Sequence, residues 1–244
     1  LDPNIFWVAG IYGPGIFKTT DGGSTFARLG NISHIDYVSV DFTDPTRQTL
    51  AAGGHEQSQT VWRSTNGGQT WTNVGANLPA GTTFSSAPIV INAQTIVVGA
   101  IQSWSSGTTG IYRTTNGGAS WTRVSSLAPI GATPLRASNG TIYWSAGDTI
   151  IKSSDSGLTW TQVGSGLQRT TPIELPDGRI VSARGSNLVV SSDGGSTWTA
   201  FGANLPFNIT EGTGIAYLHA QGAFFVRQWD CGNSVLPNAI MKLQ

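Results

Sequence analysis

The sequence of 244 residues contains few charged residues, one cysteine and no long apolar segment. Only 11% of the residues are charged, and 13 basic residues balance 13 acidic ones. This composition argues against binding to nucleic acid or to an anionic membrane surface, because both need an excess of positive charge. No apolar run approaches the ~20 residues that a membrane-spanning helix requires. We therefore expect neither nucleic acid nor a membrane as a partner.

The single cysteine, Cys231, excludes an intramolecular disulfide and a zinc site built from thiolates. We expect it to be a buried, unreactive thiol. No other group of residues has the spacing of metal ligands, so we expect no metal and no cofactor.

The chain is rich in turn-forming and aromatic residues, with 32 glycines and nine tryptophans. The segment Ser191–Trp198, with the sequence SSDGGSTW, has four near copies elsewhere in the chain. The five segments fit the template S/T-x-D/N-x-G-x-T/S-W/F. The four copies are Thr19–Phe26, Ser64–Trp71, Thr114–Trp121 and Ser153–Trp160.

The spacing of these segments predicts a repeat architecture. Their third positions are 45, 50, 39 and 38 residues apart, which is close to the ~40–50 residues of a propeller blade. An Asp or Asn side chain accepts hydrogen bonds from backbone N–H groups ahead of it, and the glycine two positions later tolerates a positive φ. Short alternating runs flank each segment, so we predict that each closes a β-hairpin.

These five segments resemble the Asp-box (BNR) repeats of sialidases, xyloglucan-active glycoside hydrolases and sortilin-type receptors. The resemblance implies an all-β fold, a β-propeller, in which the box is a structural turn on the face away from the active site. Function must then be sought in other residues of the scaffold.

We predict a single domain over residues 1–244 with six blades of three or four antiparallel strands, labelled A to D from the inside outward. The first blade lacks strand A, and the last has strands A to C only, which suits a ring closed between two three-stranded blades. Seven blades would require additional sequence, as in a fragment of a longer protein. Strand A is expected at Tyr37–Phe42 in the second blade, Pro134–Ala137 in the fourth and Pro172–Leu175 in the fifth.

The loops opposite the repeat turns, between strands B and C and between D and A, are where we expect the site. In the second blade they carry a set of residues suited to acid/base chemistry. The set could act as a carboxylate pair in glycoside hydrolysis or by His/Tyr proton transfer in polysaccharide elimination. The alternative is polar loop residues with local hydrogen bonds. These catalytic candidates are His34, Asp36, Tyr37, His55 and Glu56.

Two further groups are candidates for binding substrate. Loop aromatics suit stacking on sugar rings, although they could instead pack between blades. Arginines could bind the carboxylate of an acidic sugar. The substrate-binding candidates are Tyr12, Trp104, Arg136, Arg184, Arg227, Trp229 and Asp230, with Arg169 as a further arginine of the same kind.

The resemblance does not transfer catalytic residues. Xyloglucan-active hydrolases place catalytic aspartates on two facing propellers, whereas one propeller is predicted here. The resemblance therefore implies either a different activity or a missing partner domain. Sialidases carry an arginine triad and a first-blade Arg-Ile-Pro signature that this sequence lacks.

The favoured function is a secreted, monomeric, polysaccharide-recognising propeller that cleaves its glycan as a glycoside hydrolase or polysaccharide lyase. Secretion and glycosylation are expected from three N-x-S/T sequons, at Asn31, Asn139 and Asn208, and from the absence of an initiator methionine, which suggests a processed chain. The alternatives are a non-catalytic, lectin-like propeller and a protein-interaction scaffold.

Overall fold

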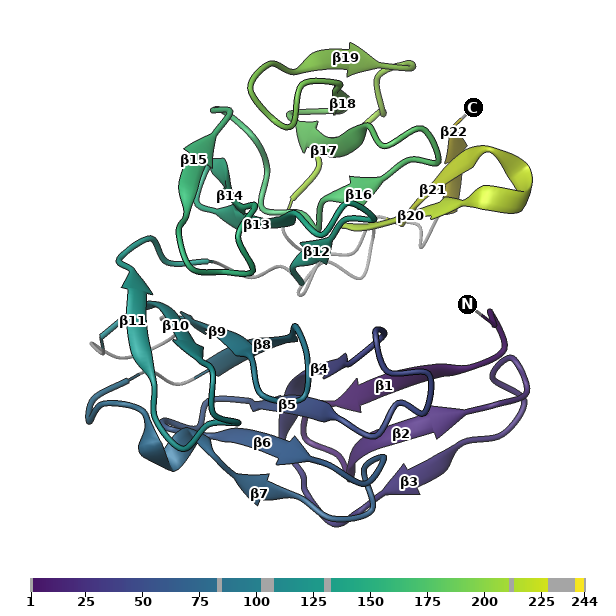
Figure 1. The fold of residues 1–244 in the computed structure, drawn as a ribbon. Coiled ribbons are helices and arrows are strands. Elements are labelled where there is room, and N and C mark those ends of the chain that lie inside the picture. Colours follow the sequence, from purple (N-terminus) through teal and green to yellow (C-terminus); the bar gives the residue numbers. More distant parts are fainter. Residues whose placement is uncertain are drawn as a thin grey trace. The chain divides into compact units, whose positions relative to one another are not determined.

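The computed structural model describes residues 2–82, 85–101, 108–129, 133–210, 213–227 and 240–243, and these form six antiparallel β-sheets (Figure 1). The chain divides into two compact units, Leu1–Ala128 and Pro129–Gln244, with three sheets each. None of the helices in the described residues has the length and apolar character needed to span a bilayer.

The first unit contains one three-stranded and two four-stranded sheets, and in each of them consecutive strands pair. A short 3₁₀ helix, Gly75–Asn77, follows the second sheet. The strands are β1 (Phe6–Gly10), β2 (Gly15–Thr19) and β3 (Ala27–Leu29); β4 (Ile35–Val40), β5 (Leu50–Gly54), β6 (Val61–Ser64) and β7 (Thr72–Asn73); and β8 (Ser85–Val90), β9 (Ile96–Ile101), β10 (Gly110–Thr114) and β11 (Thr122–Ser125).

The second unit has two four-stranded sheets and one three-stranded sheet. A 3₁₀ turn, His219–Gln221, connects the first two strands of the last sheet. The strands are β12 (Leu135–Arg136), β13 (Ile142–Ala146), β14 (Thr149–Ser153) and β15 (Thr161–Val163); β16 (Ile173–Glu174), β17 (Ile180–Arg184), β18 (Asn187–Ser191) and β19 (Thr199–Phe201); and β20 (Gly214–Leu218), β21 (Ala223–Arg227) and β22 (Ile240–Leu243).

These sheets are the six blades of a β-propeller fold, as the repeat spacing predicts. The two three-stranded blades fall at the start and end of the chain, as expected. Strands β5, β9 and β13, the second strands of the second, third and fourth sheets, are buried at almost every described side chain, and most of these side chains are apolar. In the first unit, Val61 of β6, Val98 of β9 and Tyr112 of β10 belong to one core cluster, and each is at most 1% exposed.

The five repeat segments form the turns between the last two strands of the first five sheets, and they share one pattern of hydrogen bonds. In the last turn, Thr197 donates to Asp193 through its backbone N–H (2.9 Å) and its hydroxyl (2.6 Å), while the Gly195 N–H donates to Ser191 Oγ (2.7 Å). The backbone N–H bonds recur in the other four turns. In the two turns with asparagine, the side-chain bond is reversed, because Nδ2 of Asn66 and of Asn116 donates to the hydroxyl oxygens of Thr70 and Ser120. The glycine at the fifth template position has a φ between 80° and 94° in all five turns.

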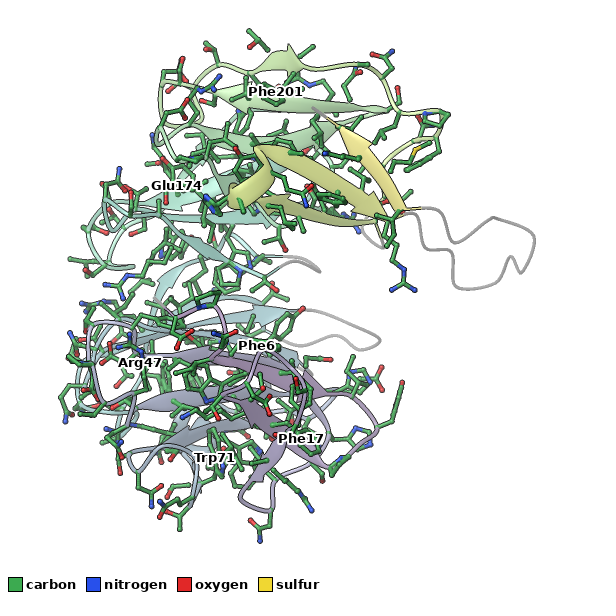
Figure 2. All side chains as sticks on the ribbon, turned by 90° about the vertical axis from the view of Figure 1, so that its right-hand side faces the viewer. Phe6, Phe17, Arg47, Trp71, Glu174 and Phe201 are labelled. Carbon is green, nitrogen blue, oxygen red and sulfur yellow. The ribbon has the colours of Figure 1, made fainter. Side chains whose placement is uncertain are left out.

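The repeat turns also connect neighbouring sheets within each unit. Trp71 Nε1 donates to the carbonyl of Leu29 in the preceding sheet (3.2 Å; Figure 2), and Trp121 Nε1 donates to the carbonyl of Val74 (3.0 Å). In the second unit, a Cβ added to Gly195 would meet Val163 of the preceding sheet at 2.8 Å. Each of these turns therefore packs closely against the end of the sheet before it.

The first strands of three sheets differ from their predicted ranges. Strands β12 and β16 have two residues each instead of four. Pro134 and Pro172 have no N–H to donate at their starts, and Ala137 and Leu175 already belong to the hairpin turns, where their N–H groups donate to the carbonyls of Thr141 and Arg179. Strand β4 begins at Ile35, two residues earlier than predicted, and ends at Val40 because the carboxylate of buried Asp41 caps a turn by accepting from the Thr43 N–H (2.9 Å).

Candidate functional site

A group of polar side chains gathers at the end of the first two sheets that lies away from the repeat turns. Connections in an antiparallel sheet alternate between its two ends, so the β1–β2, β3–β4 and β5–β6 connections share this end. Together with the start of β4, they supply the five residues that we call the histidine cluster: Tyr12, His34, Asp36, His55 and Glu56.

His55 lies at the centre of this cluster and has a partner on each ring nitrogen. Its Nδ1 lies 2.9 Å from Asp36 Oδ1, and its Nε2 lies 3.2 Å from the hydroxyl of Tyr12. A carboxylate only accepts hydrogen bonds, so Nδ1 carries the proton and Nε2 is left to accept from the phenol. The arrangement is a relay from carboxylate to imidazole to phenol.

The relay runs from a mostly buried group to an exposed one. The side chains of Asp36 and His55 are 12% and 15% exposed, whereas Tyr12 is 77% exposed. Burial of the inner pair strengthens its electrostatic interaction, and the exposed phenol is the member that a large ligand can reach. In chemical terms, the group can pass a proton between a bound molecule and His55 while Asp36 stabilises the imidazolium.

The remaining members pack around this relay. Tyr12 makes edge-to-face ring contacts with His34 and His55, at centroid distances of 5.3 and 5.0 Å, and the two imidazoles stack at 5.7 Å. Glu56 Oε1 lies 4.0 Å from His55 Nε2. A protonated His55 therefore has a carboxylate on either side.

The backbone is unusual at four of these positions. The register of β4 against β5 shifts at Asp36, which occupies a β-bulge between Ile35 and Tyr37. Tyr12, His34 and Glu56 are non-glycine residues with φ of 54°, 58° and 50°. Bulges and left-handed residues of this kind concentrate at functional sites because they re-aim side chains at a conformational cost. Their coincidence in one cluster supports a functional role for it.

Tyr37 is adjacent to the bulge but differs from Tyr12. Burial, together with the negative charge of Asp36, raises the pKa of Tyr37 to about 12. The Tyr37 phenol is therefore harder to deprotonate than that of an ordinary tyrosine, which disfavours Tyr37 as a base. Of the two tyrosines, only Tyr12 has the hydrogen bond to His55 that a proton-transfer role requires.

The predicted substrate-binding residues that the structure describes come from both units: Tyr12 from the first, and Arg136, Arg184 and Arg227 from the second. Tyr12 belongs to the histidine cluster rather than to a separate aromatic platform. The predicted platform residues Trp104 and Trp229, together with Asp230, lie outside the described residues.

The arginines lie at different ends of their sheets. Arg184 and Arg227 end the second strands β17 and β21, at the end away from the repeat turns. Arg136 pairs with Ile142, which in turn pairs with Ser153 beside the fourth repeat turn, so Arg136 lies at the opposite end of its sheet. The expected position of Arg136 is therefore wrong, because the short strand β12 runs directly into the hairpin that precedes β13.

The catalytic candidates can be recognised in the sequence, whereas the bulge and the left-handed residues that arrange them cannot. Alternating patterns carry no sign of a bulge, and no glycine marks the left-handed positions. Within the described ranges, no group of three His, Cys, Asp or Glu side chains is placed to hold a metal ion.

Comparison with known proteins identifies the fold. No family model matches the chain, and no curated protein matches it. Solved structures of propeller proteins do match. YCF48 bound to D1 peptide has a TM-score of 0.60 at 16% identity, over 93% of this chain and 72% of that one.

Two larger proteins have similar scores. The GH74 xyloglucanase from Xanthomonas campestris has a TM-score of 0.60 at 16% identity over 92% of this chain. PorZ, a surface component of the type-IX secretion system of Porphyromonas gingivalis, has a TM-score of 0.63 at 15% identity over 92% of this chain. This chain spans 40% of the xyloglucanase chain and 36% of the PorZ chain. At such low identity, these similarities establish the propeller fold alone.

Proposed function

We propose that this protein cleaves a polysaccharide by proton transfer through Tyr12, His55 and Asp36. The observation that carries the proposal is the continuous relay, with 2.9 Å between Asp36 and His55 and 3.2 Å between His55 and Tyr12. Such a relay can make a phenol act as a base at neutral pH, because His55 accepts its proton and Asp36 stabilises the resulting cation.

The reaction that best fits this relay is elimination in a uronate-containing polysaccharide. Tyr12, having given its proton to His55, removes the C5 proton of the uronate. The C5–H electron pair forms the C4–C5 double bond, and the bond from C4 to the glycosidic oxygen breaks. The departing oxygen takes a proton back from the Tyr12–His55 pair, which restores the relay and needs no other reactant.

The exposure and charge of the cluster agree with this chemistry. An exposed Tyr12 can approach a long polymer lying across the sheet ends. His34 stacks on His55 beside the phenol, and we propose that it interacts with the substrate carboxylate, whose charge grows as the C5 proton leaves.

Glycoside hydrolysis by Asp36 and Glu56 is the second candidate, because similarity to a xyloglucanase associates this fold with polysaccharide substrates. Hydrolysis requires two carboxyl groups on either side of the scissile bond. Asp36 instead directs its carboxylate to His55 and is only 12% exposed. The geometry therefore favours elimination.

Other features extend the proposal. We propose that the five repeat turns are Asp boxes, that the protein is secreted, and that its partner is a glycan. A non-catalytic lectin, or a peptide-binding propeller as the name of the YCF48 structure indicates for that protein, is the main alternative.

The test is incubation with a panel of uronate-containing and neutral polysaccharides, followed by mass spectrometry and ultraviolet detection of unsaturated uronates. We expect unsaturated products, and we expect Tyr12→Phe and His55→Gln each to lower kcat by a factor of about 10² to 10⁴, the usual contribution of a positioned acid or base. Tyr217→Phe, at a tyrosine outside the cluster that contacts His219 and Phe224, is the matched control and should leave kcat unchanged.

Different products separate the candidates. Saturated reducing ends that depend on Glu56 would replace elimination with hydrolysis. Binding of a polysaccharide without any product would leave a lectin. Binding of peptides with no binding of any polysaccharide would refute the glycan proposal.

A further inference from the structure

The second unit contains a cavity of about 500 Å³ at the end of its sheets that lies away from the repeat turns. It is lined by the hairpin between β13 and β14, the segment between β15 and β16, and Thr210 before β20. This volume is within the range of small-ligand sites. None of its lining residues belongs to the histidine cluster, so it would be a separate site.

The cavity wall is held in place by backbone hydrogen bonds. The Leu167 N–H donates to the carbonyl of Asp148 (2.8 Å), and the Gln168 N–H donates to the carbonyl of Ala183 (2.8 Å). Leu167 is 3% exposed and packs in a core cluster with Tyr143 and Ile150. The segment between β15 and β16 is therefore anchored to the β13–β14 turn and to β17, which pre-forms the cavity without a ligand.

Two glycines keep the wall open. Gly147 and Gly166 have φ of 68° and 64°, where any other residue would be strained. A Cβ added to Gly147 would meet no atom within 4 Å, so this backbone borders open space. Backbone N–H and carbonyl groups at such a position are accessible to a ligand.

The side chains that line the cavity can both donate and accept hydrogen bonds. Asp148 supplies a carboxylate, Gln168 a carboxamide, Arg169 a guanidinium and Thr210 a hydroxyl. The carboxylate, the carboxamide and the guanidinium are planar, and each can form two hydrogen bonds to adjacent hydroxyl groups of a ligand, which themselves donate and accept.

The lining also excludes other classes of ligand. Leu167 is its one large apolar side chain and is buried in the core, so the cavity offers little surface to an apolar ligand. The lining carries one carboxylate and one guanidinium, and the nearby guanidinium of Arg184 donates to the Ser165 carbonyl (3.0 Å). The positive charge of these groups exceeds the negative charge by only one, which is little for binding a polyanion.

We infer that this cavity, with Asp148 and Gln168 as its principal hydrogen-bonding groups, binds a neutral sugar residue of a polysaccharide without cleaving it. The inference rests partly on the proposed function, because that function also requires a polysaccharide ligand. It adds a second place on the chain that holds the polymer.

The experiment is a titration of ¹⁵N-labelled His55→Gln protein with methyl β-D-glucopyranoside and with D-glucuronate, followed by NMR. The catalytic substitution prevents turnover. We expect the neutral glycoside to shift the amide signals of Gly147 and Gly166 and the side-chain amide signal of Gln168. In the same background, Asp148→Asn and Gln168→Ala should each raise the dissociation constant at least about tenfold, as expected for loss of a charged or bidentate partner.

A second cavity in the same unit provides the matched control. It has a volume of about 480 Å³ and lies beside Glu174 (Figure 2), whose carboxylate accepts from the N–H and hydroxyl of Ser138 at 2.7 Å each. Glu174→Gln should leave the affinity unchanged.

The inference would be overturned if Asp148→Asn left the affinity of the His55→Gln protein for the neutral glycoside unchanged while circular dichroism showed both proteins to be folded. Amide shifts confined to the surroundings of Glu174 would also overturn it. Tighter binding of D-glucuronate than of the neutral glycoside would overturn the assignment to neutral sugars. The titration measures binding and not cleavage. If the histidine cluster cleaves no polysaccharide, the binding result still tests the cavity, so failure of the two proposals can be told apart.

Discussion

Replacing Gly118 with alanine should destabilise the fold through a single contact between two neighbouring sheets. Gly118 is the fifth template residue of the third repeat turn, and its φ is 91°. A Cβ at this position would lie 2.5 Å from Cβ and 2.8 Å from Cγ2 of Val74, the residue that follows β7 in the preceding sheet. Val74 is 9% exposed and belongs to the core cluster, so it has little room to move.

Two costs combine in this variant. An L-residue in the left-handed region costs about 1–2 kcal/mol, and forcing extra atoms into a packed core costs about 1–3 kcal/mol. We expect the free energy of unfolding to fall by about 2–5 kcal/mol in total. For a protein of this length, that corresponds to a Tm lower by roughly 4–20 °C.

Gly140→Ala is the control that isolates the contact. Gly140 has a similar φ of 85°, but a Cβ there would meet nothing within 4 Å. Urea unfolding of both variants should show Gly118→Ala to be less stable than Gly140→Ala by the packing cost alone, about 1–3 kcal/mol. Equal loss in the two variants would show that the turn does not pack rigidly on Val74, and the description of the turns as contacts between sheets would be wrong.

Three further predictions concern titration and packing. Hydrogen bonds from Thr197 and Ser191 lower the pKa of Asp193 to about 2. The contribution of Asp193 to the free energy of unfolding is therefore present above the unfolded pKa of 3.8 and is lost as the pH falls through about 2. Urea unfolding between pH 5 and 2 should show a smaller loss of stability for Asp193→Asn than for the unsubstituted protein. The pKa of Tyr37 is raised to about 12, so its contribution to stability is present below the unfolded pKa of 10 and is lost as the pH rises toward 12. The ultraviolet titration of Tyr37→Phe should therefore lack one phenol that ionises late. Loss of a phenol that ionises near pH 10 would contradict this. Trp198→Phe removes the hydrogen bond from Nε1 to the Gly195 carbonyl (2.8 Å) and should cost about 1–3 kcal/mol in urea unfolding, whereas no change would show that this bond contributes nothing.

The scaffold could be predicted from the sequence because its signals are local. Each repeat turn needs an acceptor at one position and a glycine two positions later, and both are visible in the five segments. The first strands of the fourth and fifth sheets were less predictable. Their lengths depend on the proline before each strand and on where the following hairpin turn begins, and not on apolar periodicity.

The candidate site could be predicted only in part. His34, Asp36, His55 and Glu56 could be predicted as neighbours, because connections at one end of a sheet converge. The contact of Tyr12 with His55 could not be predicted, because Tyr12 comes from a different sheet and has an uncommon left-handed backbone conformation. Interactions between residues that are distant in the sequence leave no periodic trace.

The packing of each repeat turn on the preceding sheet has a consequence for how the molecule comes apart. At three junctions, marked by Leu29, Val74 and Val163, a repeat turn packs on the sheet before it. Damage to one of these turns should therefore weaken the contact between two neighbouring sheets and leave the other junctions in place.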